Sequence, residues 1–74
     1  MSGIPATLSR GSTGADVERL QRDLAQLGYN VGSVDGMFGE QTENAVKEFQ
    51  TANSLSSDGV VGPQTGRALG AALA

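Results

Sequence analysis

The sequence predicts an all-α fold, a compact bundle of three short helices with two Asp-Gly-x-x-Gly turns. Three stretches carry apolar residues spaced three or four positions apart, whereas no stretch is long enough to build a β-sheet. Residues 35–46 and 58–69 repeat one pattern 23 positions apart, an Asp-Gly turn followed by helical spacing. A fainter copy begins at Gly14, so the chain uses a turn-and-helix unit about three times.

The first helix is predicted from Ala15 to Leu27. Thr13 and Asp16 fit a capping box, in which each side chain satisfies a free backbone N–H of the first turn. Gly28 closes the helix, because a residue without a Cβ enters the left-handed region at little cost. The apolar stripe consists of Val17, Leu20, Leu24 and Leu27.

The second helix is predicted from Glu40 to Ala52, and the third begins at Pro63. Proline suits a first helical position because its φ is fixed and its missing N–H would be unpaired there. The stretch 29–34 is expected to be a loop. The buried face of the second helix is Thr42, Ala45, Val46, Phe49 and Ala52, and the third helix continues through Ala68, Leu69 and Leu73.

These helices must bury one another, because isolated helices this short are marginal in water. Two outward ion pairs at i, i+4 are predicted, Glu18 with Arg22 and Glu43 with Lys47. So small a core predicts a stability of only about 3–5 kcal/mol. The predicted core is Leu8, Val17, Leu20, Leu24, Leu27, Val46, Phe49, Leu55, Val60, Val61 and Leu69.

The composition excludes several classes of function. With 74 residues there is room for one domain, and the absence of His and Cys excludes a zinc hydrolase, a cysteine protease or a Ser-His-Asp hydrolase within this chain. A net charge of −3 argues against nucleic acid and a membrane surface, and no apolar run reaches the roughly 20 residues of a membrane span. Residues 1–6 lack the basic and apolar segments of a secretory signal. We therefore expect that the chain works in the compartment where it is made, leaves it by a route other than signal-peptide export, or was cut from a longer parent protein.

The Asp-Gly turns have a structural interpretation. The carboxylate of Asp35 can accept N–H bonds from the residues two and three positions ahead, while Gly36 takes a positive φ and Gly39 lets the next helix start close by. The same interpretation fits residues 58–62. Both Asp side chains are then staples of their turns.

Leu-Gln and Phe-Gln pairs, at residues 20–21 and 49–50, lie on the predicted helices that precede the two Asp-Gly-x-x-Gly turns. With these motifs the chain resembles the peptidoglycan-binding-domain-like family over residues 8–73, with residues 1–7 as an N-terminal tail. The resemblance implies a three-helix, non-catalytic module that holds cell-wall enzymes on peptidoglycan, and related modules precede zinc amidases, D-alanyl-D-alanine carboxypeptidases and L,D-transpeptidases. This chain has Ser54 where the family usually has Gly, which costs up to about 1 kcal/mol if Ser54 is left-handed, unless Asn53 takes that role. The resemblance rests on Leu20-Gln21, Leu24, Leu27-Gly28-Tyr29, Asp35-Gly36-x-Phe38-Gly39-x-x-Thr42-x-x-Ala45-Val46-x-x-Phe49-Gln50 and Leu55-x-x-Asp58-Gly59-Val60-Val61-Gly62-x-x-Thr65-x-x-Leu69.

A module that binds glycan or stem peptide needs a groove with amide and hydroxyl groups beside a flat apolar contact. Free N–H groups at the start of the second helix could receive a stem-peptide carboxylate. Competing structural roles are packing for Phe38 and Phe49 and loop bracing for Gln21 and Gln50. The candidate ligand-binding residues are Tyr29, Asp35, Gly36, Phe38, Gly39, Gln41, Thr42 and Gln50.

No catalytic residue, metal site or cofactor is expected. Glu40 and Glu43 lie one turn apart near a helix start, where the dipole favours their charge, and no second wall faces them as a glycosidase requires. The Asp-Gly turns also lack the dense acidic ligands of a calcium loop.

The leading functional hypothesis is a peptidoglycan-binding module that targets a parent protein or particle to the bacterial cell wall. The expected partners are glycan or stem peptide, together with a fused or associated cell-wall hydrolase or a phage structural protein. The expected location is extracytoplasmic at the wall, or on a phage particle. The alternative is a docking or decoration subunit of a phage particle or envelope assembly that reuses the fold. A small groove with few aromatic residues predicts micromolar or weaker affinity, which tethering or multivalent display would raise.

Overall fold

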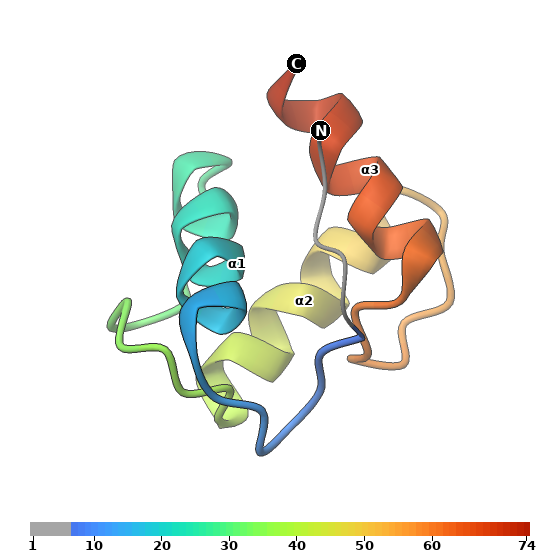
Figure 1. Ribbon diagram of the computed structural model, residues 1–74. Helices are drawn as coiled ribbons and strands as arrows, with labels where there is room; N and C mark the ends of the chain where they lie inside the picture. The colour runs from blue at the N-terminus through green and yellow to red at the C-terminus, as the bar shows by residue number, and fades with distance from the viewer. Residues whose placement is uncertain (1–6) are drawn as a thin grey trace.

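Three helices, α1 (Ala15–Gln26), α2 (Glu40–Ala52) and α3 (Pro63–Leu73), make up the fold in the computed structural model, which describes residues 7–74 (Figure 1). α1 and α3 flank α2, and loops rich in glycine connect them. The predicted all-α three-helix architecture is confirmed. Of the predicted tail, residues 1–6 lie outside the described part of the chain.

The helix boundaries follow the predicted ones closely, but the predicted capping box is wrong. α1 ends at Gln26, one residue early, and its N-cap is Gly14, with no side-chain cap hydrogen bond. Thr13 instead forms an isolated antiparallel bridge with Met37. The reason is tertiary: the backbone before α1 is held against the loop before α2, where Gly14 N donates to Gly36 O at 2.9 Å.

The segment before α1 ties both Asp-Gly loops together. Leu8 and Val61 exchange two backbone hydrogen bonds, of 3.0 and 2.8 Å, next to α3. A few residues later, Phe38 N donates to Ser12 O and Gly11 N donates to Phe38 O, each at 2.9 Å. In Figure 1 this blue segment passes from the α3 side of the molecule to the α1 side. Within residues 7–74 these contacts remain isolated bridges, in agreement with the expectation that no sheet forms.

α1 ends in a Schellman motif closed by Gly28. Gly28 N donates to Ala25 O at 3.0 Å, and Tyr29 N reaches back to Leu24 O at 2.9 Å. Gly28 has φ 95°, so the left-handed position falls on glycine, as predicted.

α2 ends in the same motif without a glycine. Ser54 N donates to Thr51 O at 3.2 Å, and Leu55 N donates to Gln50 O at 2.8 Å. Ser54 has φ 59°, the one positive φ among the non-glycine residues of 7–74, whereas Asn53 stays at φ −107°. Ser54 therefore carries the left-handed strain that the sequence suggested.

The core lies where the three helices meet. Eight of the predicted core residues are fully buried, and Leu27, Leu55 and Val60 are half-buried at its edge. Val31, Phe38 and Ala45 join the buried set, Val31 from the loop after α1. The buried hydrophobic residues are Leu8, Val17, Leu20, Leu24, Val31, Phe38, Ala45, Val46, Phe49, Val61 and Leu69.

One of the two predicted ion pairs forms. Arg22 and Glu18 meet at 3.0 Å on the exposed face of α1, where such a pair contributes little stability. The predicted pair of Glu43 with Lys47 is wrong, because Glu43 instead meets Arg10 at 3.1 Å. Arg10 comes from the segment before α1, which a prediction from the helix alone does not include. No helix within residues 7–74 is long and apolar enough to cross a membrane.

Candidate functional site

Each Asp-Gly loop is organised around a buried glutamine. The amide nitrogen of Gln21, in α1, donates to Asp35 Oδ1 (3.1 Å), Met37 O (3.0 Å) and Thr42 Oγ1 (3.0 Å). Its amide oxygen accepts the backbone N–H groups of Asp35 (3.0 Å) and Gly36 (2.9 Å). One side chain, 1% exposed, thus joins α1, the loop and the first turn of α2.

Gln50, in α2, repeats this arrangement at the second loop. Its amide nitrogen donates to Asp58 Oδ1 (3.0 Å), Val60 O (3.0 Å) and Thr65 Oγ1 (3.1 Å), and its amide oxygen accepts Gly59 N (3.0 Å). The side chain is also 1% exposed. The interpretation of Gln21 and Gln50 as loop braces is therefore confirmed.

The two carboxylates act within these loops. Asp35 Oδ1 accepts Met37 N at 3.0 Å, and Asp58 Oδ1 accepts Val60 N at 2.9 Å. These backbone N–H groups, followed by the glutamine amides, hold the pKa of each carboxyl below its usual range. Both aspartates therefore stay ionised at neutral pH and are unsuited to donate a proton.

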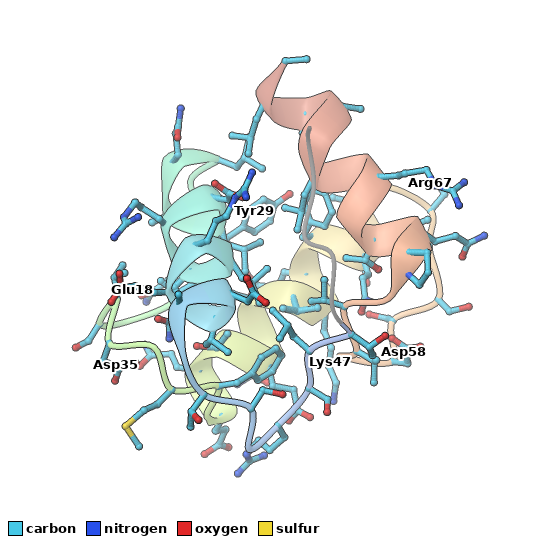
Figure 2. All side chains as sticks on the ribbon, viewed as in Figure 1. Glu18, Tyr29, Asp35, Lys47, Asp58 and Arg67 are labelled. Carbon is cyan, nitrogen blue, oxygen red and sulfur yellow. The ribbon has the colours of Figure 1, made fainter. Side chains whose placement is uncertain are left out.

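Asp35 and Asp58 lie on opposite sides of α2 (Figure 2). One groove lies beside each aspartate. The Asp35 groove has a volume of about 210 Å³ and the Asp58 groove about 340 Å³. The Asp35 groove is lined by Gln21, Val31, Ser33, Asp35, Met37, Gly39, Glu40, Gln41 and Thr42. The Asp58 groove is lined by Gln50, Leu55, Ser56, Asp58, Val60, Gly62, Pro63, Gln64 and Thr65.

The structure brings together half of the predicted ligand-binding residues. Four of them line the Asp35 groove, namely Asp35, Gly39, Gln41 and Thr42. Gly36 is buried within the loop, and Phe38 is 2% exposed in the core.

Two other predicted residues lie elsewhere. Gln50 lines the Asp58 groove. Tyr29 lines neither groove: it is half-buried between α1 and α3, edge-to-face on Phe49 with ring centroids 5.8 Å apart (Figure 2).

Several residues that line the grooves were not predicted from the sequence. Met37 is 61% exposed at the Asp35 groove, while its neighbour Phe38 points into the core. Alternation along an extended segment would have indicated that only one of the two is buried. In the Asp58 groove, Gln64 and Pro63 could have been found by carrying the 23-residue repeat from the first loop to the second.

Catalytic and metal chemistry find no support in the described residues. Glu43 is paired with Arg10, and Glu40 is exposed at the start of α2. Residues 7–74 contain no group of three or more Asp, Glu, His or Cys placed to hold a metal ion. Amide, hydroxyl and single carboxylate groups in grooves can hold a polar ligand by hydrogen bonds.

The fold and its paired grooves define a small helical binding module. The sequence matches, over residues 13–69, the family described as "Putative peptidoglycan binding domain". The N-acetylmuramoyl-L-alanine amidase CwlM of Mycobacterium tuberculosis is 48% identical over 56 residues, which are 76% of this chain and 14% of the amidase. The chain belongs to this peptidoglycan-binding domain family.

Solved structures show the same relationship. The crystal structure of the SleB N-terminal domain superimposes with a TM-score of 0.91 at 35% identity and covers all of both chains. The Burkholderia AP3 phage endolysin gives a TM-score of 0.86 at 40% identity over 90% of this chain and 26% of the endolysin. The chain is thus a peptidoglycan-binding domain, and it spans only a fraction of the amidase and the endolysin. These likenesses do not favour the docking or decoration alternative.

Proposed function

We propose that this chain is a non-catalytic module that binds peptidoglycan through the Asp35 groove and so holds a cell-wall hydrolase, of bacterial or phage origin, on its substrate. The observation that carries the proposal is the groove itself, built by a braced loop in a chain of this family. The similarity to an amidase and an endolysin supports a hydrolase as the parent protein.

The groove offers an apolar contact beside polar groups. The exposed thioether of Met37 supplies the apolar surface, and thioethers adapt to irregular partners. Gln41 and Ser33, both exposed, present an amide and a hydroxyl next to it. A sugar ring or a peptide amide needs this combination.

The negative charge of the Asp35 groove restricts the chemical groups that it can bind. The carboxylates of Asp35 and Glu40 both line the groove. They repel a stem-peptide carboxylate at the start of α2 and favour groups that donate hydrogen bonds, such as sugar hydroxyls and amide N–H groups. We therefore prefer hydroxyl or amide recognition to the carboxylate recognition considered from the sequence.

The buried candidates have an indirect role in this proposal. Gly36 and Phe38, buried within the loop, and Thr42, bonded to the brace Gln21, help to fix the shape of the Asp35 loop. Tyr29 stabilises the core through Phe49, and Gln50 braces the other loop. Substituting them would change binding through the fold.

The test is co-sedimentation of the purified chain with insoluble peptidoglycan sacculi over a salt series. The binding variants are Met37→Ala and Gln41→Ala, and the matched control is Gln26→Ala, an exposed glutamine of α1 that lines neither groove. We expect saturable, salt-resistant binding that falls about three- to tenfold in each variant, the loss of one modest contact. Absence of wild-type binding would refute wall binding, and unchanged binding by both variants would refute the Asp35 groove as the site.

A further inference from the structure

The Asp58 groove is a second copy of the Asp35 groove with a different surface. Seven of its nine lining residues lie 23 positions after a lining residue of the Asp35 groove, and the brace Gln50 takes the place of Gln21. The equivalent contacts have nearly equal lengths, with 3.0 Å to the loop carbonyl in both. The repeat has therefore preserved a complete pocket frame and not merely a turn.

The Asp58 groove is also the larger of the two, and the connections that lead into the two loops differ in length. Asp35 follows the left-handed Gly28 by seven positions, whereas Asp58 follows the left-handed Ser54 by four. The longer connection places buried Val31 against the Asp35 groove, and the end of the Gln41 side chain lies so close to Gly32 that a Cβ there would displace it. The shorter connection contributes Leu55 and Ser56 to the lining of the Asp58 groove. Only the Asp58 groove, at about 340 Å³, reaches the size usual for a small-ligand site, about 300–1,000 Å³.

The walls of the Asp58 groove are more apolar and less acidic. Where the first groove has the carboxylate of Glu40, the second has the ring of Pro63. Half-buried Leu55 and Val60 complete an apolar wall. The exposed side chains of Ser56 and Gln64, which also line this groove, add a hydroxyl and an amide group.

Asp58 offers one acceptor to a ligand. Its Oδ1 is occupied by Gln50 and by Val60 N, while its Oδ2 makes no hydrogen bond to any residue of 7–74. A free carboxylate oxygen beside an apolar wall fits an amide N–H that carries a methyl group close by. Both the acetamido group of an amino sugar and an alanyl residue of a peptide have this chemistry.

We propose that the Asp58 groove is a second ligand subsite that takes a neutral, methyl-bearing amide, and that the two grooves hold neighbouring units of one peptidoglycan strand. The part about neighbouring units rests on the proposed function. Thr42 and Gln50, which anchor the two grooves, are eight positions apart on α2, about 12 Å along a helix. A polymer held at two points gains affinity from the second contact because that contact is intramolecular.

The helix starts provide a matched pair of variants. Glu40 and Pro63 each occupy the first position of a helix, after a glycine with nearly equal backbone angles, φ −104° and ψ −163° against φ −99° and ψ −165°. Pro63→Glu gives the Asp58 groove the carboxylate of its copy, and Glu40→Pro gives the Asp35 groove the ring. Proline and glutamate are both tolerated at a first helical position, so both variants should fold. Gln64→Ala, at an exposed position of the Asp58 groove, is a second variant that does not change a helix start.

The first experiment titrates the ¹⁵N-labelled chain with two soluble probes, an N-acetylglucosamine trimer and a synthetic stem pentapeptide ending in D-alanyl-D-alanine. We expect at least one probe to shift the amide signals of Gly59, Gly62 and Gln64 saturably, in the wild type and in Glu40→Pro. Affinity at these signals should fall at least about fivefold in Pro63→Glu or Gln64→Ala. The probe that succeeds identifies the acetamido or the alanyl group. No shift from either probe at about 10 mM, or equal affinity in both groove variants, would overturn the subsite.

The second experiment uses sacculi and tests the two-point contact. Pro63→Glu and Gln41→Ala should each lower the affinity about three- to tenfold, and the double variant should bind at background. Wild-type affinity in Pro63→Glu, with binding by the wild type intact, would overturn the two-point contact and leave the proposed function standing. If the wild type fails to bind sacculi, the proposed function fails, while the soluble probes still decide the chemistry of the Asp58 groove.

Discussion

Replacing Ser54 by glycine should stabilise the domain. Ser54 occupies the left-handed position that closes α2, with φ 59°. A side chain in that conformation costs about 1–2 kcal/mol. The greater freedom of glycine in the unfolded chain offsets about 0.4–1 kcal/mol of the gain. Ser54 Oγ makes no hydrogen bond within residues 7–74, so nothing else is lost. We expect Ser54→Gly to raise the free energy of unfolding by about 0.5–1 kcal/mol.

Two control substitutions, one at each helix end, test this prediction further. Gly28→Ser places the same side chain at the equivalent position of α1, where φ is 95° and a Cβ meets no atom within 4 Å. Its expected net cost is therefore the backbone strain less the same unfolded-state term, about 0.5–1 kcal/mol. Asn53→Gly should also destabilise, because Asn53 has φ −107° and its side chain donates to Phe49 O at 2.9 Å. Glycine therefore helps at position 54 and not at position 53.

The measurement is thermal and urea unfolding followed by circular dichroism. In a domain of this size 1 kcal/mol corresponds to about 4–8 °C in Tm, so Ser54→Gly should raise the Tm by about 2–8 °C. An unchanged or lower Tm in Ser54→Gly would refute the strain argument. A Gly28→Ser variant as stable as the wild type would refute it independently.

Three further predictions concern the braces, the aspartates and Tyr29. Gln50→Ala should lower the free energy of unfolding in urea by about 2–4 kcal/mol, because the four hydrogen bonds of a buried amide are lost. The control Gln64→Ala, at an exposed glutamine, should stay near the wild-type value. The pKa values of Asp35 and Asp58 are lowered in the fold. The free energy of unfolding in urea should therefore be constant above about pH 5 and fall as the pH drops below the ordinary Asp pKa of about 3.9. An equally steep fall in the double variant Asp35→Asn/Asp58→Asn would show that the two aspartates do not cause it. Tyr29→Ala should lower the Tm, because the packing of its ring on Phe49 is lost. Tyr29→Phe keeps that packing and should keep both the Tm and the binding to sacculi. Loss of binding in a stable Tyr29→Phe variant would show that the hydroxyl contacts the ligand.

Local signals in the sequence determined most of the helical framework. α2 begins at Glu40 and ends at Ala52 as the apolar stripe predicts, and α3 begins at Pro63 because proline suits that position. The strained Ser54 was also foreseeable, since a helix end needs a left-handed residue nearby. Such features depend on a few adjacent residues, and their physical causes act within one or two turns of chain.

The contents of the site depended on contacts between distant residues. The exposed Met37 and buried Phe38 are neighbours in sequence, and only the packing of the loop against the core separates them. Glu43 pairs with Arg10 across 33 positions, and Gln21 reaches a loop 14 positions ahead. The sequence repeat indicated two equivalent loops, but only the tertiary structure shows that the second groove is larger, because the packing of each connection decides which of its side chains line the groove.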